Sequence, residues 1–250
     1  MIKLKNAAQI AHMKKAGRIT GEALEIAREN IRPGVTTKHL DDLIRRYIEK
    51  CGARPSFLGY SGFPGSACIS VNEQVIHGIP SSHIVLQEGD IVKVDVGAYI
   101  DGFHGDAART FAVGQVSPEA EKLIRVTEEC FWKGIEQVKL GNRLGDVGFA
   151  IESHALEAGY SVVKKYIGHG VGADLHESPD VPNYGTPGRG QRIMAGMTIA
   201  VEPMVCAGTG NVNELSDGWT VVTADQKLSA HYENTIAITE NEILILTKVD

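Results

Sequence analysis

Small and apolar residues recur at helical spacing along residues 6–31, and this pattern predicts a first helix that ends before Pro33-Gly34. A second helix is predicted from a cap at Thr36 or Thr37 to about Cys51, because the inward positions return every three or four residues. The same spacing predicts two further helices at 118–138 and 144–158.

Alternation of apolar and polar residues predicts two long strands at 91–98 and 103–113. Asp101-Gly102 between them is typical of a two-residue hairpin turn. A stretch rich in Gly, Pro and Ser at 54–66 is expected to be a loop. Shorter strands are predicted at 67–71, 74–77, 162–167, 197–205, 219–223, 228–238 and 242–247.

The order of elements, two helices followed by strands, occurs twice, and a constant offset of 107 residues relates the two series. The offset carries Gly34 onto Gly141, and it carries Asp95 onto Glu202. It also superimposes the apolar face and the final glycine of one helix on another: Leu40 on Val147, Ile44 on Ile151, Ile48 on Ala155 and Gly52 on Gly159. We therefore expect an α+β fold of two similar halves that share an antiparallel sheet, with a site near their pseudo-two-fold axis.

The composition of the 250 residues is that of an ordinary globular protein, with 43% hydrophobic and 22% charged residues. The formal net charge of −6 argues against a basic nucleic-acid groove. No apolar run reaches the roughly 18 residues of a membrane span, and the N-terminus has no apolar signal core. The four cysteines form no C-x-x-C pair, so reduced thiols in a cytoplasmic protein are expected.

Two carboxylates are predicted on one buried face of the hairpin. If Asp101-Gly102 is its turn, Asp95 lies opposite Ala108, and Asp106 is the diagonal neighbour of Asp95. Carboxylates placed so closely repel each other and lose hydration, and bound cations remove both costs. The alternative is one surface aspartate and one capping aspartate.

Glu202 and Glu233 each adjoin an apolar strand, and His169 lies in a Gly-rich turn, Gly168-His169-Gly170-Val171-Gly172. Each residue alone could be an ordinary strand-end or surface residue, as could His77 and His176. Taken together, four carboxylates balance the charge of two divalent ions, and a neutral imidazole completes one coordination sphere. Such donors suit Mn, Fe, Co or Zn, and paired ions that share a water favour hydrolytic chemistry.

Eight segments of the chain, in order, resemble the type I methionine aminopeptidases of the pita-bread fold family. They include Val94-Asp95-Val96-Gly97, Gly105-Asp106, Gly168–Gly172, His176-Glu177-Ser178-Pro179, Ala200–Pro203 and His231–Thr235. The ordered Asp, Asp, His, Glu, Glu set is shared with prolidases and proline aminopeptidases. The stretch Gly59–Pro80 points to the methionine enzymes. The resemblance spans the chain and implies a single metallopeptidase catalytic domain over 1–250.

The resemblance implies a role for each candidate residue. Asp106 and Glu233 would bridge two divalent ions, Asp95 would bind one ion, and His169 with Glu202 would bind the other. Glu202 would also be the general base, His176 would hydrogen-bond the substrate, and His77 would contact the scissile amide. The methionine pocket would consist of Phe57, Tyr60, Phe63, Cys68, His77 and Trp219. Phe57 and Leu175 depart from residues common in relatives, which affects the shape of this pocket.

The implied activity is removal of the N-terminal methionine from nascent proteins and peptides with a small second residue. Implied partners are these chains and the ribosome, with no membrane, no nucleic-acid specificity and a monomeric state. Because its own second residue is Ile2, the protein is expected to keep Met1. Two alternatives are a proline-specific aminopeptidase or dipeptidase of the same fold, and a non-catalytic peptide-binding module.

Overall fold

The computed structural model describes residues 1–249, and it contains the four predicted long helices. Asn6 caps the first helix in a reciprocal pair with Gln9, Thr36 caps the second through the amide of His39, and Ser117 caps the third. Each cap satisfies amides that the first helical turn leaves free. The helices are α1 (Ala7–Asn30), α2 (Thr37–Lys50), α3 (Pro118–Glu136) and α4 (Leu144–Glu157).

The predicted hairpin is formed by β4 (Ile91–Ile100) and β5 (Phe103–Ala112), the two longest strands. Asp101 and Gly102 both have positive φ, 53° and 87°, which is the backbone conformation of a two-residue hairpin turn. The register pairs Asp95 with Ala108, as predicted from the turn. On its other edge, β4 pairs with β1 (Arg54–Pro55) and β2 (Ala67–Val71), and β3 (Gln74–Ile76) follows.

The strands of the second half are shorter than predicted. The expected strands 197–205 and 228–238 are each broken, at Glu202-Pro203 and at Tyr232-Glu233. Pro203 has no amide to donate, so the ladder stops there. The prediction of a strand at 162–167 was wrong except at its first residue. Four short strands were not predicted: β1 in the expected loop, and β7, β8 and β11 in the second half. The strands are β6 (Ser161–Val162), β7 (Gly168–Gly170), β8 (Glu177–Val181), β9 (Thr198–Val201), β10 (Met204–Cys206), β11 (Val212–Glu214), β12 (Val221–Thr223), β13 (Ser229–His231), β14 (Asn234–Ile238) and β15 (Ile243–Ile245).

The predicted repeat is confirmed in the hydrogen-bonding pattern. An offset of 107 carries the bounds of α2 onto those of α4. It also carries the two pairs of β1 with β4 onto those of β6 with β10, and the isolated bridge Thr36–Val85 onto Arg143–Arg192. Gly34 and Gly141, which begin the repeat, share a positive φ of 88° and 94°. The two halves therefore have the same local topology.

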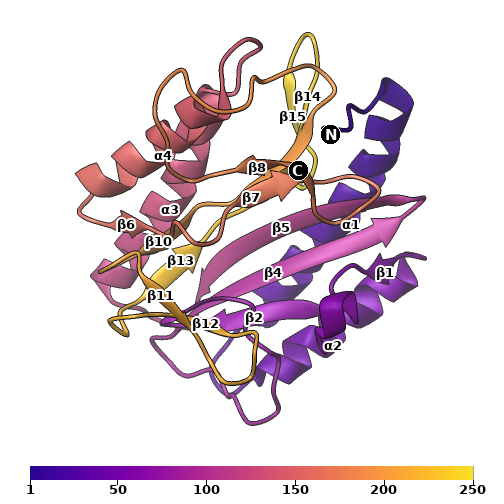
Figure 1. The fold of residues 1–250 in the computed structure, drawn as a ribbon. Helices are drawn as coiled ribbons and strands as arrows, with labels where there is room; N and C mark the ends of the chain where they lie inside the picture. The colour runs from indigo at the N-terminus through magenta and orange to yellow at the C-terminus, as the bar shows by residue number, and fades with distance from the viewer. Residues whose placement is uncertain (250) are drawn as a thin grey trace.

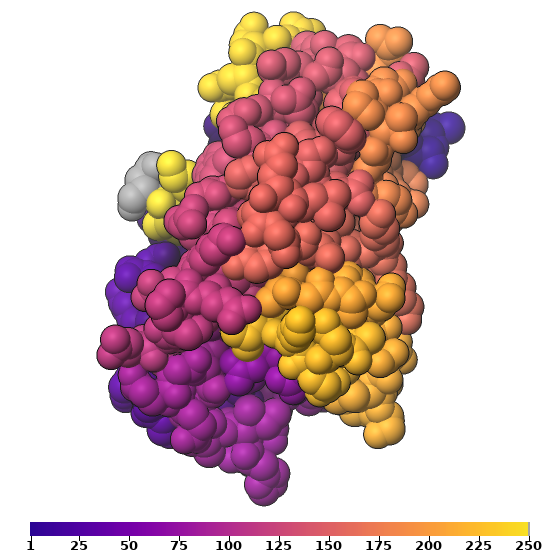
Figure 2. Space-filling view, turned by 90° about the vertical axis from the view of Figure 1, so that its left-hand side faces the viewer, coloured from indigo at the N-terminus to yellow at the C-terminus, as the bar shows by residue number. Residues whose placement is uncertain are grey.

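Each half has its own apolar core between a helix pair and strands. α1 and α2 cover β2 and β4, whereas α3 and α4 cover strands of the second half (Figure 1). In a side view, purple residues of the first half occupy the lower end, with pink to orange residues of the second half above them (Figure 2). The halves are joined where the amide of Glu233 donates to the carbonyl of Ala108 on β5, at 2.9 Å. At this junction the middle of β5 meets the residue that directly precedes β14.

Candidate metal and substrate site

The five predicted metal ligands come from five different strands or strand ends and line one cavity of about 370 Å³. Asp95 and Asp106 lie on β4 and β5, and His169 lies on β7. Glu202 follows β9, and Glu233 precedes β14. Since Asn234 pairs with Val201 and His231 with Met204, Glu202 and Glu233 face each other across the break in both strands. The breaks thus place two carboxylates at one point.

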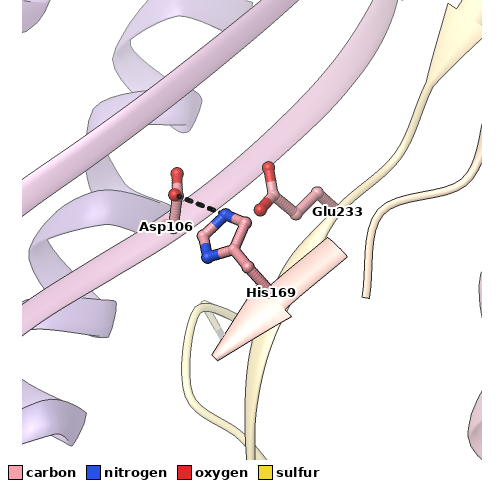
Figure 3. Close-up of side chains that lie close together, drawn as sticks. All are labelled: Asp106, His169 and Glu233. Carbon is pink, nitrogen blue, oxygen red and sulfur yellow. Dashed lines mark ion pairs between the residues drawn. The ribbon is translucent and has the colours of Figure 1, made fainter. Parts of the chain in front are cut away.

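Asp106, His169 and Glu233 point toward one another from β5, β7 and the start of β14 (Figure 3). One ligand atom from each of the three lies within 4.8 Å of the others. His169 Nε2 lies 3.7 Å from Asp106 Oδ2 and 3.6 Å from Glu202 Oε1, too far for a hydrogen bond. His169 Nδ1 is within 2.9 Å of the Gly170 carbonyl, which orients the ring so that Nε2 faces the carboxylates.

Two carboxylate oxygens of this cluster are buried without a hydrogen-bond donor. Asp95 Oδ1 and Asp106 Oδ1 have no hydrogen-bond partner within residues 1–249. Burial raises the pKa of Asp106 to about 7. Burial, and then repulsion from Asp106, hold the pKa values of Asp95, Glu202 and Glu233 well above their ordinary range. Oxygen donors that lack partners, with one neutral imidazole, fit divalent cations, because cations satisfy the oxygens and cancel the repulsion.

Two of the predicted histidines lie at the same cavity. His176 Nδ1 is 2.8 Å from the Tyr60 hydroxyl, and its ring centroid is 4.1 Å from that of His169. His77 has a positive φ of 59°, and its ring lies edge-on to Trp219 at 6.3 Å. Burial lowers the pKa of His77 to about 4 and also lowers that of His176, so both imidazoles are neutral at pH 7.

An apolar cluster forms another part of the cavity wall. Its buried members are Phe57, Phe63, Cys68 and Leu175, and Trp219 packs against them. The rings of Phe63 and Trp219 meet edge to face at 5.1 Å, a favourable aromatic geometry. Tyr60 is 41% exposed beside this cluster. All predicted pocket residues line the cavity, together with lining residues that were not predicted: Ser61, Ile76, Lys165, Tyr166 and Ile167.

Two residues beside the carboxylates, the buried His231 and the half-buried Arg109, were not predicted. His231 has neither ring nitrogen hydrogen-bonded within the described chain, and its Nε2 lies 3.7 Å from Glu202 and 4.0 Å from Glu233. Arg109 donates to the Glu233 carbonyl at 2.5 Å and to Asn234 Oδ1 at 2.7 Å. His231 stands two residues before Glu233, so strand alternation could have placed both on one face.

Comparison with known proteins relates this site to a family. The model of metallopeptidase family M24 matches residues 11–240. The chain belongs to metallopeptidase family M24. This M24 metallopeptidase is 57% identical over 250 residues to the methionine aminopeptidase of Clostridium perfringens, covering 99% of this chain and 100% of that protein. It is 49% identical over 249 residues to methionine aminopeptidase 1 of Bacillus subtilis, covering 100% of both.

Solved structures of M24 relatives confirm the pita-bread fold. The methionine aminopeptidase of Thermotoga maritima superimposes with a TM-score of 0.98 at 46% identity, covering 100% of both chains. A prolidase from Pyrococcus furiosus gives a TM-score of 0.79 at 24% identity, covering 99% of this chain and 66% of that one. The prolidase match therefore shows the fold alone. None of the helices in residues 1–249 of this M24 metallopeptidase is long and apolar enough to cross a membrane.

Proposed function

We propose that the protein hydrolyses the first peptide bond of chains that begin with methionine, with a preference for a small second residue. The observation that carries this proposal is that one cavity is lined by five metal-binding side chains and by the apolar cluster around Phe63 and Trp219. An unbranched thioether packs well against aromatic rings. The full-length similarity to proteins named methionine aminopeptidase supports the same substrate.

The proposed ligands are Asp95, Asp106, His169, Glu202 and Glu233, which would hold two divalent ions of the Mn, Fe, Co or Zn group. Such ions, when bound, lower the pKa of water and polarise a carbonyl group. Four carboxylates match the charge of two ions, so the pair leaves no net charge in the buried cluster.

The remaining chemistry is proposed for side chains of this protein. Glu202 accepts the proton of the attacking water and passes it to the leaving amine, because its carboxylate lines the cavity at the strand break, beside the other proposed ligands. With the Tyr60 hydroxyl donating to its Nδ1, His176 has an Nε2–H free to donate to the carbonyl oxygen as negative charge develops there. His77, between Trp219 and Tyr166, would contact the scissile amide.

The test is release of free methionine from Met-Ala-Ser and Met-Leu-Ser, with chelated protein and with each divalent metal restored. Metal-dependent cleavage of Met-Ala-Ser alone supports the site and the substrate preference. Asp106→Asn should abolish this cleavage, whereas Asp180→Asn, a change of an exposed aspartate on β8, should not. Cleavage of an X-Pro peptide in place of both would assign the protein to proline-specific chemistry, and absence of metal binding would leave a peptide-binding module.

We further propose that residues 1–250 act as one catalytic domain, as a monomer in the cytoplasm, on nascent chains near the ribosome. The proposals on nascent chains and on the cytoplasm follow from the proposed substrate, and the family match over residues 11–240 supports a single catalytic domain. Light scattering coupled to size exclusion would test the monomer, and metal analysis of protein purified without added metal would identify the bound ions.

A further inference from the structure

A buried ion pair lies beneath the turn that carries His176. Lys5 Nζ is 2.5 Å from Glu177 Oε2, and the two side chains are only 5% and 2% exposed. The pair joins residues 172 positions apart in the sequence. Buried charges of this kind are stable only when each has its partner, so the contact specifies where both backbone segments lie.

Glu177 organises the turn through both of its carboxylate oxygens. Oε1 accepts a hydrogen bond from the Asp174 amide at 3.2 Å, while Oε2 binds Lys5. Burial raises the pKa of Glu177, but the hydrogen bonds from Lys5 and Asp174 lower it by more than burial raises it. The pKa of Glu177 therefore lies below the ordinary value, and the group is charged. Gly172 leaves room for this contact, because a Cβ there would lie 2.7 Å from Lys5 Nζ and 2.6 Å from Glu177 Oε1.

The N-terminal segment is itself anchored to the second half of the molecule. The Lys5 amide donates to the Gly196 carbonyl at 2.7 Å, and Lys5 Nζ donates to the Lys3 carbonyl at 2.9 Å. A second ion pair, Lys3 with Asp174 at 2.6 Å, binds the outside of the same turn, but its side chains are 56% and 67% exposed. Lys3 Nζ also lies 3.5 Å from Glu177 Oε1, so residues 3–5 hold the turn 172–177 by three ion pairs, and in only one of them, Lys5 with Glu177, are both side chains buried.

His176 has few contacts of its own. Its imidazole meets the Tyr60 hydroxyl and the ring of His169, and the residue is otherwise exposed at the cavity. His176 directly precedes Glu177, the first residue of β8, and its side chain lines the cavity. Because Lys5 holds the Glu177 carboxylate beneath the turn, it also holds the backbone from which the imidazole of His176 reaches the cavity.

We propose that Lys5 is a positioning residue of the active site, whose ion pair with Glu177 holds the turn 172–177 and thereby the imidazole of His176 at the substrate carbonyl. The proposal rests on the proposed function, which gives His176 its role. Lys5 contacts neither substrate nor ions and acts only through Glu177.

The test compares wild type, Lys5→Met and the double variant Lys5→Met/Glu177→Gln in two measurements. The double variant removes the tether without leaving an unpaired buried charge, so it keeps the test open if the single variant does not fold. The matched control is Lys15→Met on α1, which removes an exposed ion pair with Asp101 of the hairpin turn. The measurements are kcat and KM on Met-Ala-Ser with metal, and the ring NMR peak of His176 in metal-free protein, assigned with His176→Gln.

We expect kcat to fall by at least about 10-fold in the folded tether variants, with KM changed less than about 3-fold, because a small misplacement of a catalytic group affects mainly the transition state. The His176 peak should broaden or divide, and Lys15→Met should match wild type. An unchanged His176 peak in the folded double variant would overturn the proposal whatever its kcat. If wild type cleaves no peptide, the proposed function fails, and the peak alone decides whether Lys5 positions His176.

Discussion

Asp95 and Glu202 occupy equivalent positions in the two halves of the molecule, 107 residues apart, and both line the same cavity. The strand that carries Asp95 is continuous, whereas its counterpart is interrupted at Pro203, directly after Glu202. The interruption lets Glu202 face Glu233. The two halves thus supply equivalent carboxylates to one site, Asp95 from within a continuous strand and Glu202 from a strand end. Without cations, the mutual repulsion of these groups opposes folding.

Divalent metal should therefore stabilise the protein. At pH 7.5 the thermal midpoint of chelated protein should rise when Mn or Co is added, and a free metal concentration of 100 times Kd corresponds to about 2.7 kcal/mol. Asp106→Asn should lose most of this gain, because the amide cannot neutralise a cation. Asp180→Asn should keep it. Scanning calorimetry measures the gain, and an equal gain in Asp106→Asn would contradict the proposed ligand set.

In chelated protein, Asp106→Asn should be more stable than wild type at high pH. The folded-state pKa of Asp106 is about 7, above the ordinary 3.8, so folding favours the protonated acid. The stabilising contribution of Asp106 to the free energy of unfolding is fully present below about pH 4 and is lost as pH rises through about 7. It amounts to about 1.4 kcal/mol for each unit by which the folded and unfolded pKa values differ.

The measurement is the difference in thermal midpoint between chelated wild type and chelated Asp106→Asn from pH 4.5 to 8. Taking this difference cancels titrating groups whose pKa does not depend on Asp106, among them Lys93, whose pKa burial lowers to about 7. The other carboxylates of the cluster do not cancel, but removal of the Asp106 charge relieves their repulsion and favours the variant in the same direction. The difference should shift in favour of the variant as pH rises. A difference independent of pH would show that Asp106 does not titrate in this range.

Trp219→Ala should weaken methionine binding. The indole forms part of the apolar pocket and packs edge to face on Phe63, so its loss should raise KM for Met-Ala-Ser by about 10-fold, equivalent to about 1.4 kcal/mol. Trp132→Ala, which changes the other of the two tryptophans, on α3, should leave KM unchanged. Binding of a methionine product should alter the fluorescence of Trp132→Phe but not of Trp219→Phe.

Arg109→Lys should destabilise the fold beside Glu233. The buried guanidinium reaches the Glu233 carbonyl and Asn234 together and stacks on Tyr232 at 4.1 Å, and an ammonium cannot reproduce this planar arrangement. We expect a loss of about 1–3 kcal/mol in the free energy of unfolding in urea. Arg54→Lys, at an exposed arginine stacked on Tyr99 at 4.2 Å, should lose less than half of that.

The sequence allowed prediction of the parts of the fold that depend on local patterns. Helix periodicity and caps located α1 to α4, and the Asp101-Gly102 turn determined the register that places Asp95 diagonal to Asp106. The break of two apolar strands at Glu202 and Glu233 was not predicted, because alternation continues across it.

Local sequence patterns could not predict contacts between segments that are distant in the sequence. β8 contains Glu177, Ser178 and Pro179, which do not favour a strand, and it forms only by pairing with β7. The surroundings of the His231 ring and of the Arg109 guanidinium are determined only when β13 packs beside β5. The carboxylates that line the cavity were nevertheless singled out from the sequence, because carboxylates in apolar strands are costly wherever the chain places them.

The divided origin of the carboxylate cluster determines when during synthesis it can first exist. Asp95 and Asp106 are made in the first half of the chain, but Glu233 falls in its last tenth. Arg109, which donates a hydrogen bond to the Glu233 carbonyl, is made with β5, long before β14 is made. A growing chain therefore carries an incomplete set of acids until Glu233 and β14 have been made, and the centre can assemble only after these residues have left the ribosome. Each newly made molecule is consequently inert toward its own N-terminus while it is being built.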